Sequence, residues 1–398
     1  MGTVLVALAS ASLLAWVYLF FFRHWFWRAA ERLPAAPPSR PERAWPHVAV
    51  VVPARDEAAT IAATLEALLA QDYPGPFTVT LVDDGSRDGT GAIAARIAAA
   101  PASAGRLRIV AGTPLPEGWS GKLWAVENGI RAVRAGEVPP PEFVFLTDAD
   151  TVHGPATLRR LVGHAETQGR DMVSLMVRLA CATSWEKRLT PAFVYFFQML
   201  YPFGAVNDDR RAMAGAAGAC ILVRRSALER AGGIAAIRGA LIDDCALAAA
   251  VKRTGGRLWL GLADDNLSLR RYPALAEFWD MVARTAYTQL RYSPLRLAGT
   301  ILGLSLVFLA PPVLTLLALA TADWPAVVPS GAAWALMTGS FAPILRYYRL
   351  SAVRAVALPA IATLYLGMTF DSARRHWRGR GGLWKGRTYA VPPSAHHG

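Results

Sequence analysis

The sequence predicts an α/β protein, in which a domain with a mostly parallel sheet follows a transmembrane anchor and precedes further transmembrane helices. Two observations lead to this prediction. Three apolar runs of strand length each end in polar or acidic residues, and long uncharged segments flank the region that contains them. Hydrophobic residues also make up 54% of the 398 residues, more than a water-soluble enzyme of this size needs.

Four uncharged segments are candidates for the membrane. A helix needs about 20 residues to span roughly 30 Å of hydrocarbon, and the segments 4–22, 297–320 and 324–345 reach that length. The fourth segment, 355–370, is shorter and could span, re-enter or lie at the interface. The first segment has no basic residues before it and no small-x-small cleavage site, which predicts an uncleaved anchor.

The net charge of +13 arises largely beside these segments. Arg23 follows the first, Arg346 follows the third, and a basic tail occupies 371–398. Because positive loops stay in the cytoplasm, the pattern predicts a multi-pass membrane protein with the loop 23–296 inside. The tail is expected inside too, which requires 355–370 not to cross. No basic motif interleaved with aromatic residues occurs, so nucleic acid is not an expected partner. The oligomeric state is not predicted.

The first predicted strand is the apolar run 48–52, and an amphipathic helix from Ile61 to Leu69 follows it. The second strand is 77–82. Each strand ends in a polar turn. The turn residues singled out as site candidates are Pro53, Ala54, Arg55 and Glu57 after the first strand, and Asp83, Asp84, Gly85 and Ser86 after the second.

The third strand, 143–146, ends in Asp148 and Asp150. Ligands of open α/β sheets bind at the carboxyl ends of the strands, and two carboxylates there suit Mg²⁺ or Mn²⁺ holding a diphosphate. An isolated Asp-x-Asp is more often a solvated turn. Here, however, a parallel sheet would bring all three polar strand ends to one edge, and that much charge favours a ligand.

The ligand class follows by exclusion. No Gly-x-Gly-x-x-Gly follows the first strand and no Walker lysine occurs, so dinucleotide and P-loop sites are excluded. A nucleotide held through carboxylates and a metal remains. In that arrangement Asp83 can accept from a base N–H, Asp148 can bind ribose hydroxyls, and Asp150 can ligate the metal.

Three later segments add candidates. Lys122 precedes a helix and could reach a phosphate or the base, or be a solvated loop lysine. Asp243 and Asp244 begin another helix, where capping explains one carboxylate and the second suggests catalysis. The aromatic stretch 185–206 is either an interfacial helix, the favoured interpretation, or a core helix. An amphipathic segment, 273–296, carries Arg284, Gln289, Arg291 and Tyr292.

These motifs resemble, in order and approximate spacing, those of the family 2 inverting glycosyltransferases, which have the GT-A fold. The matching motifs are Val51–Glu57, Val82–Ser86, Gly121-Lys122, Asp148-Ala-Asp150, the Gly-rich segment before Arg224, and Asp243-Asp244. The anchor, the segments 191–203 and 284–294, and the tail 384–389 look most like the bacterial hopene-associated glycosyltransferases. Ceramide glucosyltransferases and cellulose synthases are more distantly similar.

The resemblance implies a nucleotide-sugar donor, expected to be a UDP-sugar, a divalent metal, and a lipid acceptor such as a hopanoid. It implies that Asp150 and Asp148 bind the metal, and that Asp244 is the catalytic base, with Asp243 as the second candidate. The implied donor residues are Pro53, Ala54, Arg55, Glu57, Asp83, Asp84, Gly85, Ser86, Lys122 and Asp148. On the acceptor and diphosphate side, they are Arg284, Gln289, Arg291 and Tyr292.

Two positions depart from the family pattern. Asp56 stands where the family often has Asn, and Gln289-Leu-Arg-Tyr292 is shorter than the processive Gln-x-x-Arg-Trp motif and ends in Tyr. Transfer of a single sugar is therefore expected. An alternative is a metal-dependent nucleotidyl- or phosphosugar transferase acting on a polyprenyl lipid. A membrane scaffold or transporter with a vestigial sugar-binding domain is a third possibility.

The predicted domains follow from these patterns. They are an N-terminal transmembrane helix (1–22), a GT-A domain (46–272), an interfacial amphipathic segment (273–296), a C-terminal membrane region of two to three helices (297–370), and a basic tail (371–398).

Overall fold

The computed structural model describes residues 2–34, 44–136, 139–379, 383–384 and 387–388. The chain divides into two compact units. Among the described residues, the helical unit comprises 2–30, 181–205 and 272–379, and the sheet unit comprises 31–34, 44–136, 139–180 and 206–271. The short antiparallel pair β9 (Leu383–Trp384) and β10 (Arg387–Thr388) lies near the C-terminus.

The sheet unit is built on one sheet, which has eight strands within the described residues, in the order β3-β2-β1-β4-β7-β6-β8-β5. Strands β3, β2, β1 and β4 are parallel, as are β6 and β8, whereas β7 and β5 run antiparallel to their neighbours. The strands are β1 (Val48–Ala54), β2 (Phe77–Asp83), β3 (Leu107–Ala111), β4 (Phe143–Thr147), β5 (Thr151–Val152), β6 (Met172–Arg178), β7 (Cys220–Arg224) and β8 (Leu258–Ser268). The predicted mostly parallel sheet is confirmed.

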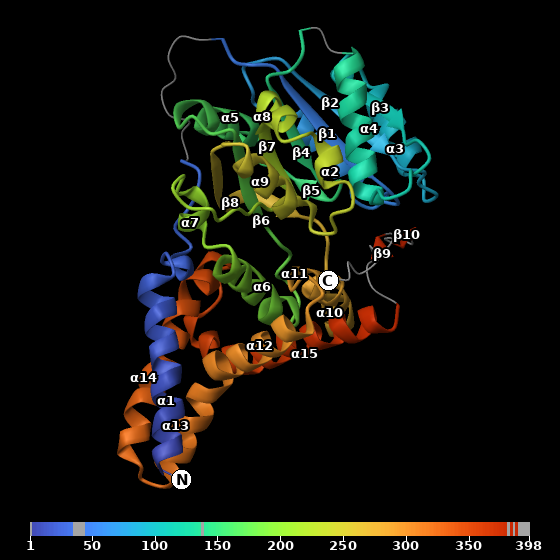
Figure 1. The fold of residues 1–398 in the computed structure, drawn as a ribbon. Helices are drawn as coiled ribbons and strands as arrows, with labels where there is room; N and C mark the ends of the chain where they lie inside the picture. The colour runs from blue at the N-terminus through green and yellow to red at the C-terminus, as the bar shows by residue number, and fades with distance from the viewer. Residues whose placement is uncertain (1, 35–43, 137–138, 380–382, 385–386, 389–398) are drawn as a thin grey trace, which may run out of the picture. The chain divides into compact units, whose positions relative to one another are not determined.

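Helices cover both faces of this sheet (Figure 1). On β1, Val50 and Val52 belong to a buried cluster with Ile61 of α2, whereas Val51 faces Gly129 of α4. The strand is therefore buried on both faces, which explains its unbroken apolar run. The helices of this unit are α2 (Ile61–Leu69), α3 (Thr90–Ala98), α4 (Gly121–Gly136), α5 (Thr157–Thr167), α8 (Arg225–Arg230) and α9 (Asp243–Arg253), and α7 (Phe203–Asn207) begins at its boundary.

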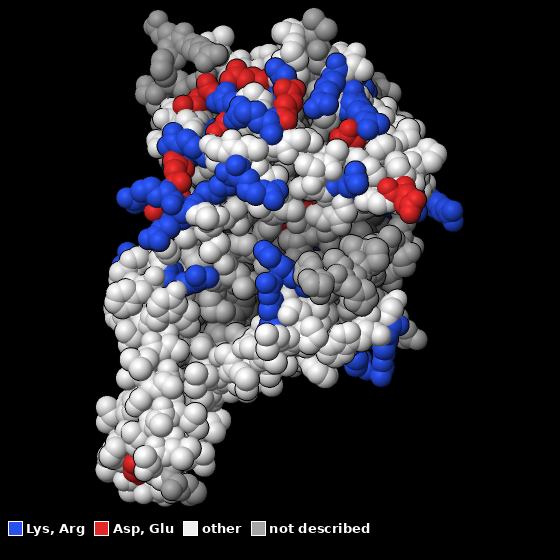
Figure 2. All heavy atoms as spheres, in the orientation of Figure 1, with Lys and Arg blue, Asp and Glu red and all other residues white. Residues whose placement is uncertain are grey.

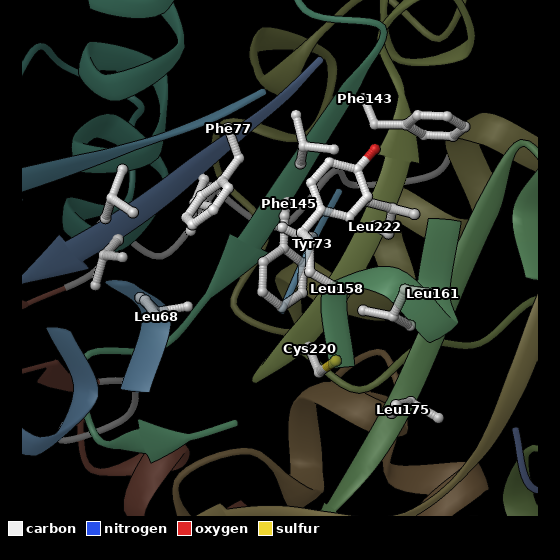
Figure 3. Packing of buried hydrophobic residues seen from close by; sticks show 14 of the residues in the cluster. Leu68, Tyr73, Phe77, Phe143, Phe145, Leu158, Leu161, Leu175, Cys220 and Leu222 are labelled. Carbon is white, nitrogen blue, oxygen red and sulfur yellow. The ribbon is translucent and has the colours of Figure 1, made fainter. Parts of the chain in front are cut away.

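Figure 3 shows the interior of this cluster, to which Phe77 of β2, Phe145 of β4, and Leu158 and Leu161 of α5 all belong. The strand register brings the polar strand ends together. Ala54 lies opposite Asp83, and Val51 lies opposite Leu146, so β1, β2 and β4 end at the same edge. The predicted alignment of the three polar turns is confirmed.

The helical unit contains the long apolar helices α1 (Gly2–Val17), α13 (Ala310–Ala320) and α14 (Trp324–Tyr347), which pack side by side (Figure 1). The face of this bundle seen in Figure 2 is almost free of Lys and Arg. The remaining helices are α6 (Glu186–Leu200), α10 (Leu275–Ala283), α11 (Ala286–Gln289), α12 (Pro294–Leu304) and α15 (Leu358–Trp377).

Three segments of the described residues are long and apolar enough to cross a membrane: Gly2–Phe22, Pro294–Ala320 and Ala352–Trp377. The third predicted span is a helix, α14, but it is not one of these three. Its Pro, Gly and Ser residues lower its hydropathy. Because Ala352–Trp377 does qualify, the prediction that 355–370 does not cross rests on charge alone.

Helix α6 belongs to the helical unit, so the predicted domain 46–272 is not continuous in space. The Tyr195 hydroxyl lies 2.7 Å from Ser340 Oγ of α14, and the Tyr365 hydroxyl of α15 donates to the Leu189 carbonyl at 2.9 Å. The Phe196 ring packs against Tyr365 as well. Packing within the unit, the alternative interpretation of 185–206, therefore explains these aromatic residues better than an interfacial position.

The predicted interfacial segment 273–296 also packs within this unit. Trp279 Nε1 donates to Asp371 Oδ2 of α15 at 2.9 Å, and the Tyr287 amide donates to Ser372 Oγ at 3.0 Å. The Tyr292 ring stacks on His376, with centroids 4.4 Å apart. The segment thus covers the polar end of α15.

A stability prediction follows from Gly129. A Cβ there would lie 2.5 Å from Val51 Cγ1 and 3.0 Å from Val82 Cγ2. Gly129→Ala should therefore lower the free energy of unfolding by about 1–3 kcal/mol, although alanine favours helix. In the control, Gly136→Ala, the new methyl meets only the movable end of Arg108. Thermal melting should show a lower Tm for Gly129→Ala alone, and equal Tm values would contradict this packing.

Candidate active site

The turn after β1 has a backbone conformation that its sequence favours. Asp56 has φ 52°, in the left-handed region that Asn and Asp adopt more readily than most residues. Its Oδ1 accepts from the Arg87 amide at 2.8 Å, and its own amide donates to Ser86 Oγ at 3.1 Å. Asp56 therefore joins the turns after β1 and β2, a conformational role in which Asp can replace Asn.

Two of the residues predicted to bind the sugar donor, Arg55 and Asp84, contact each other. The Arg55 guanidinium donates to the Asp84 carbonyl and lies 3.4 Å from Asp84 Oδ2, and Asp84 is only 2% exposed. In contrast, Asp83 is partly exposed, and its Oδ1 accepts from the Ser86 amide at 2.9 Å. Gly85 has φ 70°, which completes the turn between them. Asp83 is thus better placed than Asp84 to meet a ligand.

Lys122 joins two of the predicted catalytic elements. Its Nζ lies 2.9 Å from Asp148 Oδ1 at the end of β4 and 3.1 Å from Asp243 Oδ2 at the start of α9. Burial alone would lower the pKa of Lys122, but the nearby carboxylates raise its pKa well above the ordinary value. Lys122 is therefore a permanent cation, and its ammonium group contacts Asp148 and Asp243 at the same time.

A second group of charges surrounds Asp150. Burial and the neighbouring carboxylates of Asp148 and Glu57 raise the pKa of Asp150 to about 6. Arg270 opposes this effect: its Nε lies 4.0 Å from Asp150 Oδ2, and its Nη1 lies 3.8 Å from Glu57 Oε2. The negative charges of three carboxylates thus act on one another at this turn, and a bound cation would offset them.

Asp244, on the first turn of α9, is held by backbone amides. Its Oδ2 accepts from the Gly218 amide at 2.9 Å, and its Oδ1 accepts from the Cys245 amide at 2.7 Å. Burial, followed by the charge of Asp243, raises the pKa of Asp244 to about 6. This carboxylate can therefore both hold and release a proton near neutral pH.

A small pocket lies among these groups. Lys122, Asp148, Asp243 and Asp244 line it together with apolar side chains such as Ile237. The cavity measures ≈ 20 Å³, which is room for about one water molecule. A sugar would therefore need Lys122 or a neighbouring side chain to move.

Sequence reasoning missed several residues that shape the site. Gly218 was noted only as part of a Gly-rich segment, yet its amide binds Asp244. Thr147 Oγ1 donates to the Ala219 carbonyl at 2.9 Å and lies 2.7 Å from His153 Nε2. Burial lowers the pKa of His153 to about 4, so this ring is neutral at physiological pH. Thr147 thereby connects the Asp148 strand to the loop that holds Asp244.

The four residues predicted for the acceptor and diphosphate lie in the helical unit: Arg284, Gln289, Arg291 and Tyr292. Gln289 Nε2 donates to the Tyr201 hydroxyl at 2.5 Å. Arg291 and Tyr292 have φ values of 52° and 56° in the turn after α11. Their role toward a ligand stays a prediction.

The carboxylate oxygens at this edge suit a metal ion that takes its other ligands from a bound molecule. Within the described ranges, no group of three or more His, Cys, Asp or Glu side chains is arranged to hold a metal ion. Asp148 and Asp150 thus supply two carboxylates at most. Mg²⁺ is usually bound in this way, through one or two carboxylates with phosphate and water oxygens as the other ligands.

Comparisons with known proteins identify relatives of this chain. Residues 46–262 match the family model described as "Glycosyltransferase like family 2". An N-acetylglucosaminyltransferase of Mesorhizobium japonicum is 32% identical over 235 residues, which are 56% of this chain. The aligned part spans only half of that relative's length.

One solved structure shows the same fold. A mannosyltransferase from Pyrobaculum calidifontis, solved with GDP-Man and Mn²⁺, is 20% identical with a TM-score of 0.53, and the match covers 93% of this chain and 98% of that one. The glucosyl-3-phosphoglycerate synthase of Mycobacterium tuberculosis matches less well, with 20% identity, a TM-score of 0.41, and coverage of 64% and 85%. With the family model, the first likeness confirms the predicted GT-A fold.

Proposed function

The chain belongs to the glycosyltransferase-like family 2, and from this premise we propose that it moves a single sugar from a nucleotide-sugar donor to a lipid acceptor, with inversion. One observation carries the proposal. Lys122 contacts both Asp148, on the donor side, and Asp243, beside the candidate base. Groups for donor binding and for proton transfer therefore share one site, as transfer chemistry requires.

We assign the donor to the edge formed by β1, β2 and β4. The partly exposed Asp83 is suited to accept from the base N–H of a UDP-sugar, and Asp148 is suited to bind the ribose. Pro53, Ala54, Gly85 and Ser86 form the adjoining turns. Arg55 and Asp84 position these turns, because they pair with each other.

Asp148 and Asp150 are the residues that would hold a divalent cation, Mg²⁺ or Mn²⁺, whose charge stabilises the departing diphosphate. The support for this assignment is the crowding of their negative charges with that of Glu57. Lys122 adds a fixed positive charge next to Asp148, where it can offset charge on the leaving group.

Asp244 is our candidate for the catalytic base. An ionised carboxylate with a pKa of about 6 can accept the proton of an acceptor hydroxyl near neutral pH. Asp243 is the weaker candidate because it already forms an ion pair with Lys122 at 3.1 Å. The two backbone amides on Asp244 fix its orientation without supplying a competing proton acceptor.

The apolar helices of the helical unit are the basis for proposing a lipid acceptor. The three candidate spans of this unit would keep the enzyme at a bilayer, which we infer to be the bacterial inner membrane. The positive-inside pattern supports a cytoplasmic position for the sheet unit. A hydrophobic alcohol such as a hopanoid or polyprenol cannot cross water, so an enzyme held at the membrane suits it. The relative from Mesorhizobium makes UDP-N-acetylglucosamine the first donor to test.

The base assignment predicts a specific kinetic defect. Asp244→Asn keeps the side chain's shape and the hydrogen bond from one of the two backbone amides, but it cannot accept the proton, so kcat should fall about 10²- to 10⁴-fold. Nucleotide affinity, measured by calorimetry, should stay close to that of the wild type, because Asp244 lies outside the donor edge. Asp243→Asn makes the same chemical change but breaks the ion pair with Lys122 and leaves the candidate base in place, so its kcat should fall less. If Asp243→Asn lost activity and Asp244→Asn kept it, Asp243 would be the base.

The pH dependence provides an independent test. Because Asp244 must be ionised to act, kcat/KM at saturating metal should fall as the pH falls below about 6. The charge of Asp243 raises the pKa of Asp244, so Asp243→Asn should move this acid limb to lower pH. If kcat/KM fell at the same acidic pH in the wild type and in Asp243→Asn, a group other than Asp244 would control the pH dependence.

A further inference from the structure

Arg270 lies beside the Asp148–Asp150 turn because of an antiparallel strand pair. In the ladder between β5 and β8, Thr151 is paired with Ser268, and the Leu269 amide donates to the Asp150 carbonyl at 2.7 Å. These contacts fix the backbone immediately before Arg270. The guanidinium therefore starts from a defined position next to Asp150.

The side chain of Arg270 approaches two carboxylates without forming a hydrogen bond to either at these distances. Its nitrogens lie 3.8 Å from Glu57 Oε2 and 4.0 Å from Asp150 Oδ2, both longer than a hydrogen bond. Arg270 is 41% exposed, whereas Glu57 and Asp150 are 14% and 17% exposed. Its attraction to this pair is therefore electrostatic, and a ligand entering from solvent can reach the guanidinium.

The charges around Asp150 show what Arg270 contributes. Glu57, Asp148 and Asp150 form the crowded carboxylate group, in which Lys122 pairs with Asp148 at 2.9 Å. Among the described residues, Arg270 lies within 4.0 Å of both other carboxylates, and Lys122 acts on Asp150 as well. A divalent cation bound to Asp150 would take over this neutralisation and repel the guanidinium.

We propose that Arg270 compensates the carboxylates while the metal is absent, and that it turns to the diphosphate when the metal and the nucleotide bind. This inference rests on the proposed function, because it presumes a metal-bound diphosphate at Asp148 and Asp150. The planar guanidinium can donate two parallel hydrogen bonds to phosphate oxygens, which a loose contact with carboxylates leaves possible. Arg270 thus disfavours metal alone and favours metal with nucleotide.

The two roles predict opposite changes in one variant. Arg270→Gln removes the competing charge, so the full-length protein in detergent should bind Mn²⁺ alone about 5- to 10-fold more tightly. The same variant should bind UDP or GDP, whichever the wild type prefers, about 10-fold more weakly in the presence of Mn²⁺. Electron paramagnetic resonance of free Mn²⁺ gives the first affinity, and calorimetry gives the second.

Two further variants act as controls. Arg271→Gln makes the same charge change at the next, exposed residue and should leave both affinities near the wild-type values. Arg270→Lys keeps the charge but not the planar fork, so Mn²⁺ affinity should stay near the wild type while nucleotide affinity falls. Thermal melting identifies any variant that fails to fold.

The outcomes separate this inference from the proposed function. If the wild type binds Mn²⁺ and nucleotide but Arg270→Gln behaves like Arg271→Gln in either measurement, the role of Arg270 is wrong and the proposed function stands. The wild type could instead fail to bind Mn²⁺ alone and also fail to bind UDP or GDP in the presence of Mn²⁺. In that case the proposed function fails, and this inference fails with it.

Discussion

The ion pairs of Lys122 connect the parts of the candidate site. The lysine comes from the start of α4, and its two partners come from the end of β4 and the start of α9. Removing Lys122 would leave both partly buried carboxylates without this cation, which costs more free energy than the ion pairs themselves contribute. The distance between the donor carboxylates and the candidate base therefore depends on this one ammonium group.

The sheet makes that contact possible. The parallel register of β1, β2 and β4 places three polar strand ends at one edge, and Gly129 lets α4 approach β1 closely enough for Lys122 to reach that edge. Thr147 and Gly218 then bring the loop before β7 against Asp244. Ordinary packing of the core, rather than a separate device, thus positions the charged groups.

Sequence reasoning predicted β1, β2 and β4, their polar ends and the carboxylates, because buried parallel strands give unbroken apolar runs that stop abruptly at the ligand edge. It could not place Arg270, whose position depends on the antiparallel pairing of β5 with β8. Nor could it assign α6 to the helical unit, since aromatic residues suit both a membrane surface and a protein core. These failures concern long-range pairing, which local patterns do not contain.

The central claim is that this edge supports metal-dependent sugar transfer to a lipid. The most direct measurement uses the purified full-length protein in lipid vesicles with Mn²⁺ and a panel of labelled nucleotide sugars, including UDP-N-acetylglucosamine and GDP-mannose. Label in the organic extract, released nucleoside diphosphate, and loss of both with EDTA are the predicted results. Label that stays in water for every donor, release of nucleoside monophosphate, or activity that survives EDTA would contradict the account.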